Sequence, residues 1–247
     1  MTDQHDTIPI HQLRTACSAC SLRELCLPVG LSTDEMAKLD QAIHQRRPVK
    51  RGDVLFRTGD PLVSLYAVRT GFFKTTVVSE DGREQITGFH MPGELMGLDA
   101  LGQDRHGCSA VALEDCEVCE LPEQQLAPLS QVVPALTQHL YKLMSREIVR
   151  DQGIMLLLGN MRAEERLAAF LLNLSQRMTT RGFSSKSFHL RMTREEIGNY
   201  LGLKLETVSR TFSKLQTDGV IHVQGKLVEL QDVDALKRII SSCPGLH

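Results

Sequence analysis

The cysteines nearest the N-terminus could carry out chemistry, because three of them form the pattern Cys17-x2-Cys20-x5-Cys26. Cysteine thiolates bind zinc, copper(I) and iron–sulfur clusters. A structural zinc site usually takes two C-x2-C pairs, whereas this chain offers one such pair, a third cysteine close by and others far along the chain. The arrangement favours a cubane iron–sulfur cluster, whose irons each need one thiolate. Zinc and free or redox-active thiols are the alternatives.

The fourth ligand of such a cluster is not fixed by spacing. Cys108, Cys116 and Cys119 are all available, and the last two form a C-x2-C pair of their own. Cys243, near the C-terminus, is predicted to be a bystander. The nine histidines show no ligand spacing, and we expect them to lie at the surface.

A second chemical signal lies near the C-terminus and predicts a helix-turn-helix. The capping box Thr193-x-x-Glu196 opens one helix, Gly202 supplies a tight turn, and a second helix is predicted over 205–216. Two β-rich segments, 220–223 and 227–230, then predict a hairpin that forms a wing.

The second of these helices has one apolar and one polar side. Its inward side is predicted to hold Leu205, Val208, Phe212 and Leu215. The other side presents Glu206, Ser209 and Arg210, which we call the reading face. Arginine can donate two hydrogen bonds to guanine and glutamate can accept one from cytosine, so this face suits base reading. The alternative is a surface ion pair between Glu206 and Arg210, four residues apart.

The composition of the chain is compatible with both the cysteine chemistry and the helix-turn-helix. The 247 residues are 42% hydrophobic and carry a net charge of −2. Residues 162–247 carry 13 Lys and Arg against 9 Asp and Glu, and this basic excess is compatible with DNA binding. The longest nearly apolar run, 154–158, is too short to span a bilayer, and the polar start is unlike a secretory signal. We therefore expect a cytoplasmic protein without a membrane partner, and with cysteines that serve metal or redox chemistry.

The chain divides into four predicted segments and an α+β fold. Residues 1–30 bear the cysteines, and 31–133 alternate short β-rich runs with turn signals, as in an antiparallel β-roll or barrel. Residues 134–160 form a long helix, and 161–247 form the winged helix-turn-helix. No βαβ pattern surrounds the cysteines and no catalytic His–Asp or carboxylate pair is visible, so an enzyme is not expected.

The long helix carries a stripe that we call the seam. Its apolar members are Met144, Ile148, Met155 and Leu158, and Asp151 interrupts them at a 4-3 position. Such spacing suits pairing with a second copy of the chain. Two charges about 5 Å apart at an effective dielectric of about 20 repel by roughly 3 kcal/mol. Asp151 is therefore predicted to hold a homodimer near balance; the alternative is an aspartate at the edge of the seam, exposed to water.

Five segments, taken together, carry a family resemblance. They are CSACSLRELC (17–26), EQITGFH (84–90), VCELP (118–122), AEERLAAF (163–170) and IGNYLGLKLETVSR (197–210). Over nearly its whole length the chain resembles the FNR (fumarate and nitrate reduction) oxygen-sensing regulators of the cyclic-AMP receptor (CRP/FNR) superfamily. The resemblance implies a barrel like the cyclic-nucleotide-binding one, a dimerisation helix and a winged helix-turn-helix.

The resemblance also implies a ligand set. The family places the fourth ligand at the cysteine of VCELP, which is Cys119. A [4Fe-4S] cluster would then be held by Cys17, Cys20, Cys26 and Cys119. Cys116 departs from the family pattern, where a small hydroxyl residue is common, and leaves ligand exchange open. Two neighbours of the ligands, Ser21 and Leu25, would set the access of oxygen, as similar positions do in the family.

Partners follow from the same resemblance. Glu206, Ser209 and Arg210 match a face that reads TTGAT-like half-sites in an inverted repeat of double-stranded DNA. The turn Glu80-Asp81-Gly82 resembles a contact with RNA polymerase, although an ordinary hairpin turn is equally compatible. The resulting hypothesis is an oxygen-responsive transcriptional regulator, an activator of anaerobic genes, in which the intact cluster favours the homodimer and DNA binding.

A cyclic-nucleotide-responsive regulator without a cluster is the alternative function. The superfamily often binds cyclic nucleotide through a Gly-Glu-Leu segment and a later Arg-Ser pair. Gly93-Glu94-Leu95 is present, but Cys108-Ser109 stands in place of Arg-Ser. The cyclic phosphate would lose its main charge partner there, so the barrel is predicted to be a scaffold, and Arg105 is the residue that keeps the alternative open.

Overall fold

Two four-stranded antiparallel sheets form the N-terminal barrel, because β-rich runs alternate with glycine turns between residues 45 and 122. The computed structural model describes residues 17–43 and 45–241. In spatial order, one sheet contains β1 (Gln45–Val49), β8 (Cys116–Pro122), β3 (Ser64–Thr70) and β6 (Leu95–Met96). The other contains β2 (Val54–Phe56), β7 (Ser109–Ala112), β4 (Phe73–Val78) and β5 (Glu84–His90).

The space between the sheets is filled by inward-facing side chains from both. Phe73 and Val118 are fully buried there, and the ring of Phe56 stacks on Tyr66 at 5.8 Å between centroids. A second apolar core lies outside the first sheet and joins the cysteine loop (17–31) to the helices around it. Those helices are α1 (Thr33–Ala42), α2 (Glu123–Val132) and the start of α3.

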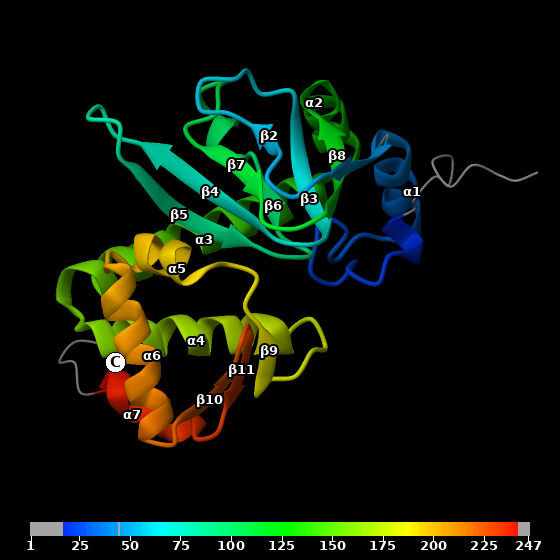
Figure 1. Cartoon of the computed structure of the whole chain (residues 1–247). Helices are drawn as coiled ribbons and strands as arrows, with labels where there is room; N and C mark the ends of the chain where they lie inside the picture. The colour runs from blue at the N-terminus through cyan, green and yellow to red at the C-terminus, as the bar shows by residue number, and fades with distance from the viewer. Residues whose placement is uncertain (1–16, 44, 242–247) are drawn as a thin grey trace, which may run out of the picture.

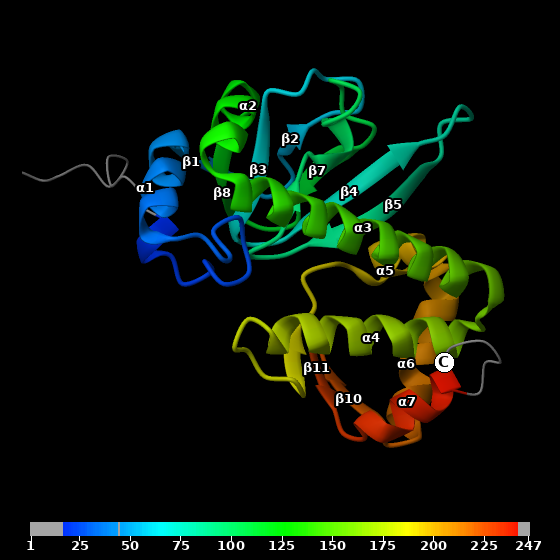
Figure 2. The same ribbon diagram turned by 180° about the vertical axis from the view of Figure 1, so that it is seen from behind.

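Helix α3 (Pro134–Asn160) begins with proline at its first turn, where the missing N–H costs nothing. It runs along the barrel toward the C-terminal part (Figures 1 and 2). Leu136 and Leu140 are buried against the second core, whereas Ile148, Val149 and Met155 are mostly exposed. No described helix is long and apolar enough to cross a membrane.

The C-terminal part is a winged helix-turn-helix built on one apolar core. Its helices are α4 (Ala163–Thr179), α5 (Arg194–Leu201), α6 (Leu205–Thr217) and α7 (Val233–Ser241). Its small sheet has the order β10 (Ile221–Gln224), β11 (Leu227–Leu230), β9 (Ser187–His189). The two views agree that this part lies beneath the barrel, with α5 next to β5.

The contact between α5 and β5 satisfies the free edge of the second sheet. Asn199 accepts a hydrogen bond from the backbone N of Ile86 at 2.5 Å and donates to the carbonyl of Glu84 at 2.8 Å. Lys74 of β4 forms an ion pair with Glu196 at 3.1 Å. Covering an edge strand in this way satisfies backbone groups that would otherwise pair with another chain.

The predicted fold class, an α+β chain with an antiparallel β-roll and a winged helix-turn-helix, is confirmed. The predicted capping box forms at Thr193, and a second one opens α1 at Ser32. The prediction that the histidines lie at the surface is wrong for His90, His106 and His139, which are 2–6% exposed. Their partners come from distant segments, so local spacing gave no sign of burial.

One predicted inward residue of the second helix is also misplaced. Val208, Phe212 and Leu215 are buried, but Leu205 is 45% exposed because it is the first residue of α6 and lies beyond the core. Five elements had no sequence signal that we recognised: β1, β6, β9, α2 and α7.

Candidate functional site

The cysteine loop is wound by short-range backbone hydrogen bonds. Cys17 begins the 3-10 turn η2 (Cys17–Ala19), Cys20 N donates to the carbonyl of Cys17 at 3.1 Å, and Cys26 N donates to that of Leu22 at 3.1 Å. Asp40 of α1 anchors the start of the loop, since its carboxylate accepts from the backbone N of Cys17 and from the hydroxyl of Ser18. These turns bring three thiols to one side of α1.

Cys119 approaches the same place from the middle strand of the first sheet. It lies on β8, paired with Arg46 on β1 and Ala67 on β3. Each of the six pairs among Cys17, Cys20, Cys26 and Cys119 interacts electrostatically. The structure therefore brings together the four predicted ligands, which we call the cysteine site.

Cys116 lies on the opposite face of β8. Residues three apart on a strand point to opposite faces, and Cys116 is buried with Val118 in the core between the sheets, whereas Cys119 joins the second core. The Cys116 thiol donates to the carbonyls of Phe72 and Glu114. Cys108 is also distant from the loop, with its thiol at 3.5 Å from Asp99. Cys243 lies outside the described residues.

A single metal ion and an iron–sulfur cluster require different spacings of the four thiols. Four sulfurs about 2.3 Å from one zinc ion lie within about 4 Å of each other, and no three His, Cys, Asp or Glu side chains among the described residues are placed to hold one ion. Cubane ligands bind separate irons and are spaced more widely. Burial raises the pKa of Cys17 and that of Cys26, the latter to about 12, so the free thiols are neutral and metal binding must displace their protons.

Two arginines beside Cys119 carry buried donors without a partner. Burial raises the pKa of the Cys119 thiol, while Arg69 and Arg46 act in the opposite direction. Nε of Arg46 and Nη1 of Arg69 are buried and make no hydrogen bond within the described residues. Donors and positive charge aimed at thiolate sulfurs are what an anionic cluster requires of its surroundings.

The other residues of the loop differ in exposure. Ser21 is exposed, and Leu25 is half-buried. His139 of α3, which sequence reasoning missed, hydrogen-bonds the backbone carbonyl of Cys26. Its Nε2 is buried without a partner, so Nδ1 makes this bond. A direct tie thus joins the cysteine loop to the long helix.

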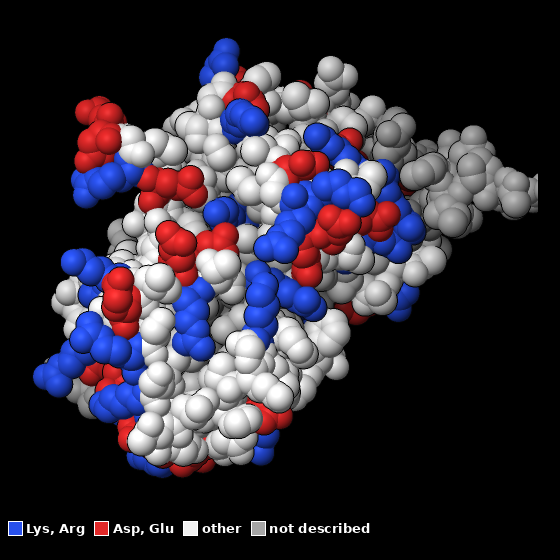
Figure 3. Space-filling view, in the orientation of Figure 1, with Lys and Arg blue, Asp and Glu red and all other residues white. Residues whose placement is uncertain are grey.

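The reading face lies on α6. Glu206 and Arg210 are exposed and Ser209 is half-buried. No ion pair between Glu206 and Arg210 is present in the described part of the chain; Nε of Arg210 instead donates to the backbone carbonyl of Glu206 at 3.4 Å. Both side chains therefore keep polar atoms for a ligand. Figure 3 shows lysine and arginine side chains over the half of the molecule that carries α6.

Two glycines set the angle between α5 and α6. Gly202 ends α5 with φ +63°, in the left-handed region that glycine tolerates. A Cβ on Gly198 would lie 2.6 Å from the carbonyl oxygen of Leu203, so the turn can pack closely only with glycine there. Arg194, at the start of α5, lies over the ring of Phe212 at 3.8 Å. These contacts fix the position of α6 relative to α5.

The middle of the seam of α3 is exposed, whereas Leu158 at its end packs against the C-terminal core. Ile148 is 58% and Met155 is 65% exposed. Asp151 is exposed between them, and Met144 and Leu158 are half-buried. Apolar exposure on this scale along one helix marks a surface that a partner covers.

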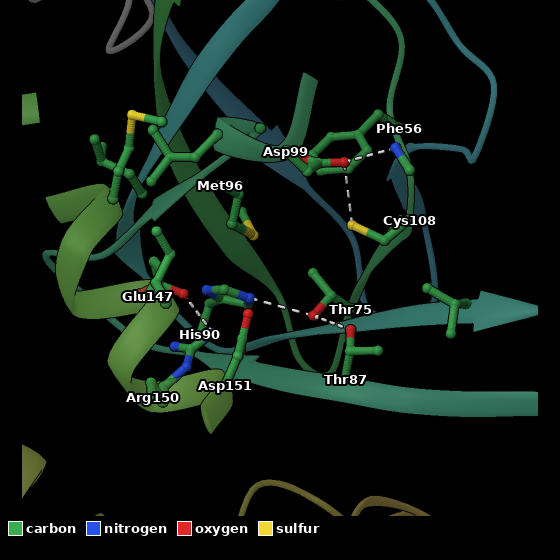
Figure 4. Close-up of a pocket in the computed structure, with 17 residues that line it drawn as sticks. Phe56, Thr75, Thr87, His90, Met96, Asp99, Cys108, Glu147, Arg150 and Asp151 are labelled. Carbon is green, nitrogen blue, oxygen red and sulfur yellow. Dashed lines mark hydrogen bonds and ion pairs between the residues drawn. The ribbon is translucent and has the colours of Figure 1, made fainter. Parts of the chain in front are cut away.

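A pocket of about 410 Å³ lies between the barrel and α3 (Figure 4). Its charged lining residues are Asp99, Glu147, Asp151 and one cation, Arg150, which pairs with Glu147 at 2.5 Å. Burial and the nearby charge of Arg150 lower the pKa of His90 to about 3, so this histidine is neutral. An excess of carboxylates opposes a cyclic phosphate.

Of the segment expected to contact cyclic nucleotide, Gly93-Glu94-Leu95, only Leu95 lines the pocket. Glu94 does not line the pocket and instead pairs with Arg177 of α4 and with Arg181, just after that helix, at 2.6 Å each. The lining includes residues 95–99 and Cys108, and burial raises the pKa of that thiol to about 12. Nη1 of Arg105 donates to the carbonyl of Gly59, and the residue does not line the pocket. The two charged residues that kept the nucleotide alternative open, Glu94 and Arg105, therefore make other contacts.

The turn Glu80-Asp81-Gly82 lies at the tip of the β4–β5 hairpin, which projects from the barrel in Figure 1. Gly82 N donates to the carbonyl of Ser79 at 2.8 Å, and Asp81 pairs with Arg83 at 2.7 Å. The turn is exposed and shaped by its own residues.

Comparison with known proteins agrees with this geometry. Residues 46–131 match the family described as cyclic nucleotide-binding domain, and residues 165–239 match the Crp-like helix-turn-helix domain. The chain is 49% identical to the transcriptional activator protein anr of Pseudomonas aeruginosa, over 92% of this chain and 93% of that protein. It is 47% identical to the fumarate and nitrate reduction regulatory protein of Escherichia coli, over 90% of this chain and 89% of that protein.

A solved structure supports the same assignment. FixK2 from Bradyrhizobium japonicum superposes with a TM-score of 0.73 at 30% identity, covering 79% of this chain and 96% of that one. TTHA1359 from Thermus thermophilus has the same fold, with a TM-score of 0.63 at 24% identity, covering 80% of this chain and 98% of that one. With relatives of this identity along nine-tenths of its length, the chain belongs to the CRP/FNR family of DNA-binding transcriptional regulators and is of the FNR type rather than an enzyme.

Proposed function

We propose that the protein is an oxygen-responsive regulator of genes for anaerobic metabolism, and that a [4Fe-4S] cluster held by Cys17, Cys20, Cys26 and Cys119 is its sensor. The observation that carries the proposal is the mutual proximity of these four thiols from two distant segments. The names of the similar proteins, among them an anaerobic regulatory protein of Pasteurella multocida, support the same response.

The cluster supplies a group that oxygen can attack. The chain's own residues then determine the outcome. The four thiols hold the loop against β8, Arg46 and Arg69 balance the negative charge, and Ser21 and Leu25 set how easily oxygen reaches the site. His139 and the shared core connect loop order to α3.

The same proposal includes a homodimer formed along α3. Ile148 and its apolar neighbours would bury their exposed surface against a second copy, while the two Asp151 carboxylates repel each other across the axis. Because burial favours the dimer and repulsion opposes it, monomer and dimer would have similar free energies, and a small change in the cysteine loop can shift the equilibrium.

The dimer presents two reading faces to DNA. In each, Glu206, Ser209 and Arg210 would enter a major groove at one half-site of a TTGAT-like inverted repeat. The exposed turn at 80–82 is the proposed contact with RNA polymerase.

The experiment that tests the proposal is purification of the full chain without air. We expect an absorption band of a [4Fe-4S] cluster, four iron and four sulfide per chain, and a dimer that binds an inverted-repeat duplex. Admission of air should remove the band and weaken both association and DNA binding. A colourless anaerobic protein that binds the duplex equally well in air would refute the proposal, and titration with cyclic AMP serves as the control for the alternative function.

A further inference from the structure

The turn between β5 and β6, residues 91–94, packs directly on the cysteine loop. Gly93 has a φ of +90°, and a Cβ built on it would lie 3.0 Å from the Cβ of Leu25. Leu25 immediately precedes Cys26. Any displacement of this part of the loop therefore changes what the turn can contact.

The other side of the same turn is held by the DNA-binding part. Glu94 accepts from Nη2 of Arg177 and from Nη2 of Arg181, each at 2.6 Å. The two arginines also donate to backbone carbonyls of the barrel, at Phe89 and Pro92, again at 2.6 Å. Both belong to the C-terminal end of α4 and the turn that follows it.

The contact is strong because little of it reaches solvent. The side chain of Arg181 is 6% exposed and that of Glu94 is 19% exposed. Burial alone would raise the pKa of Glu94, but Arg177 and Arg181 outweigh it, and the pKa is lowered. The carboxylate is therefore charged at neutral pH, and removing its charge would leave two arginines without their partner.

We propose that Glu94 is a positioning residue for DNA binding: it fixes α4, and with it the winged helix-turn-helix, to a turn whose other side is supported by the cysteine loop. Order in the loop then affects the placement of α6 within a single protomer, separately from dimerisation. That the loop is ordered by a cluster rests on the proposed function, whereas the contact itself does not need one.

Thermodynamic linkage makes the proposal testable from both sides. If the loop and α4 stabilise each other through the turn, loosening either must loosen the other by the same free energy. Amide hydrogen exchange reports such local opening segment by segment. The relevant segments are 20–31 in the loop and 174–182 at the end of α4.

The first experiment measures exchange in the full, reduced, metal-free chain carrying Glu94→Gln. We expect exchange at least about tenfold faster in both segments, because a buried charge network is broken. The matched control is Arg191→Gln, which breaks another ion pair between the same two parts, Arg191 to Glu114 at 3.2 Å, and does not involve the turn at 91–94. The control should leave segment 20–31 unchanged. Unaltered loop exchange in Glu94→Gln, or an equal effect of the control, would overturn the proposal.

The second experiment approaches from the loop with Leu25→Ala, which remains informative if the Glu94 variant does not fold. Faster exchange at 174–182 is expected, and an unchanged rate there contradicts the coupling. In air-free protein kept at a concentration where sedimentation shows only dimer, Glu94→Gln should weaken binding to the inverted-repeat duplex, and unchanged binding contradicts the proposal. Because the exchange data come from metal-free protein, a chain that binds no cluster would refute the proposed function and leave this inference standing.

Discussion

The cysteine site and the reading face are assembled in opposite ways. The reading face uses three side chains within five positions of α6, placed by the periodicity of a single helix. The cysteine site joins a loop to a strand whose ligand lies more than ninety residues further on. The spacing of residues therefore encodes a local site, whereas a non-local site depends on which face of a distant strand packs against it.

The largest expected effect tests that non-local dependence. Cys119→Ser should abolish cluster assembly, measured as loss of iron, sulfide and visible absorption in protein purified without air, because one iron loses its thiolate. The matched control is Cys116→Ser, on the other face of β8, whose hydroxyl can keep the bonds to Phe72 and Glu114. We expect the control to retain its cluster. The reverse result would assign the fourth ligand to Cys116.

This pair of residues also marks the limit of prediction from sequence. Spacing alone left Cys108, Cys116 and Cys119 open, and only the family resemblance selected Cys119. Cys116 and Cys119 lie on opposite faces of β8, and spacing does not show which face packs against the loop. By contrast, the helix-turn-helix was predicted with both helices and the wing, because caps, a turn glycine and periodicity are local signals.

Apart from Leu205, the functional residues that sequence reasoning missed or misread depend on contacts between distant segments. His139 and Arg46 have no motif of their own and gain their roles from a loop and a strand brought beside them. Glu94 sits in a segment that resembles a nucleotide-binding one, yet two arginines more than eighty residues away take its carboxylate. A one-dimensional pattern cannot show which of two partners a charged side chain reaches.

The next effect concerns α3, which links the two sites. Replacing Asp151 by alanine should strengthen dimerisation in air by about a hundredfold, since roughly 3 kcal/mol of repulsion is removed. Sedimentation equilibrium measures the change. Glu147→Gln, one turn earlier and paired with Arg150 within the protomer, serves as the control and should change association much less. An Asp151→Ala protein that stays monomeric at the same concentration would place this residue at a water-exposed edge.

A smaller effect tests the reading face. Arg210→Ala should weaken binding by about 5- to 150-fold per half-site, corresponding to about 1–3 kcal/mol per contact, and should relax discrimination at one base pair. Competition with duplexes substituted at each position of the half-site measures both. Ser213→Ala, exposed one turn further along α6, is the control. A uniform loss across all substituted duplexes would make Arg210 a phosphate contact instead.

The smallest effect concerns the tie between the cysteine loop and α3. In His139→Leu the carbonyl of Cys26 loses its donor, and a hydrogen bond of this kind contributes about 1 kcal/mol, or about fivefold in local opening. His139→Asn keeps a donor close to the position of Nδ1, whereas His139→Gln carries its amide near Nε2, which has no partner within the described residues. Exchange of the loop amides, and the rate at which the absorption band decays in air, should therefore be restored by asparagine and not by glutamine. Equal rates in the asparagine and leucine variants would show that packing alone joins this helix to the loop, and that the cysteine site is coupled to α3 through its apolar core.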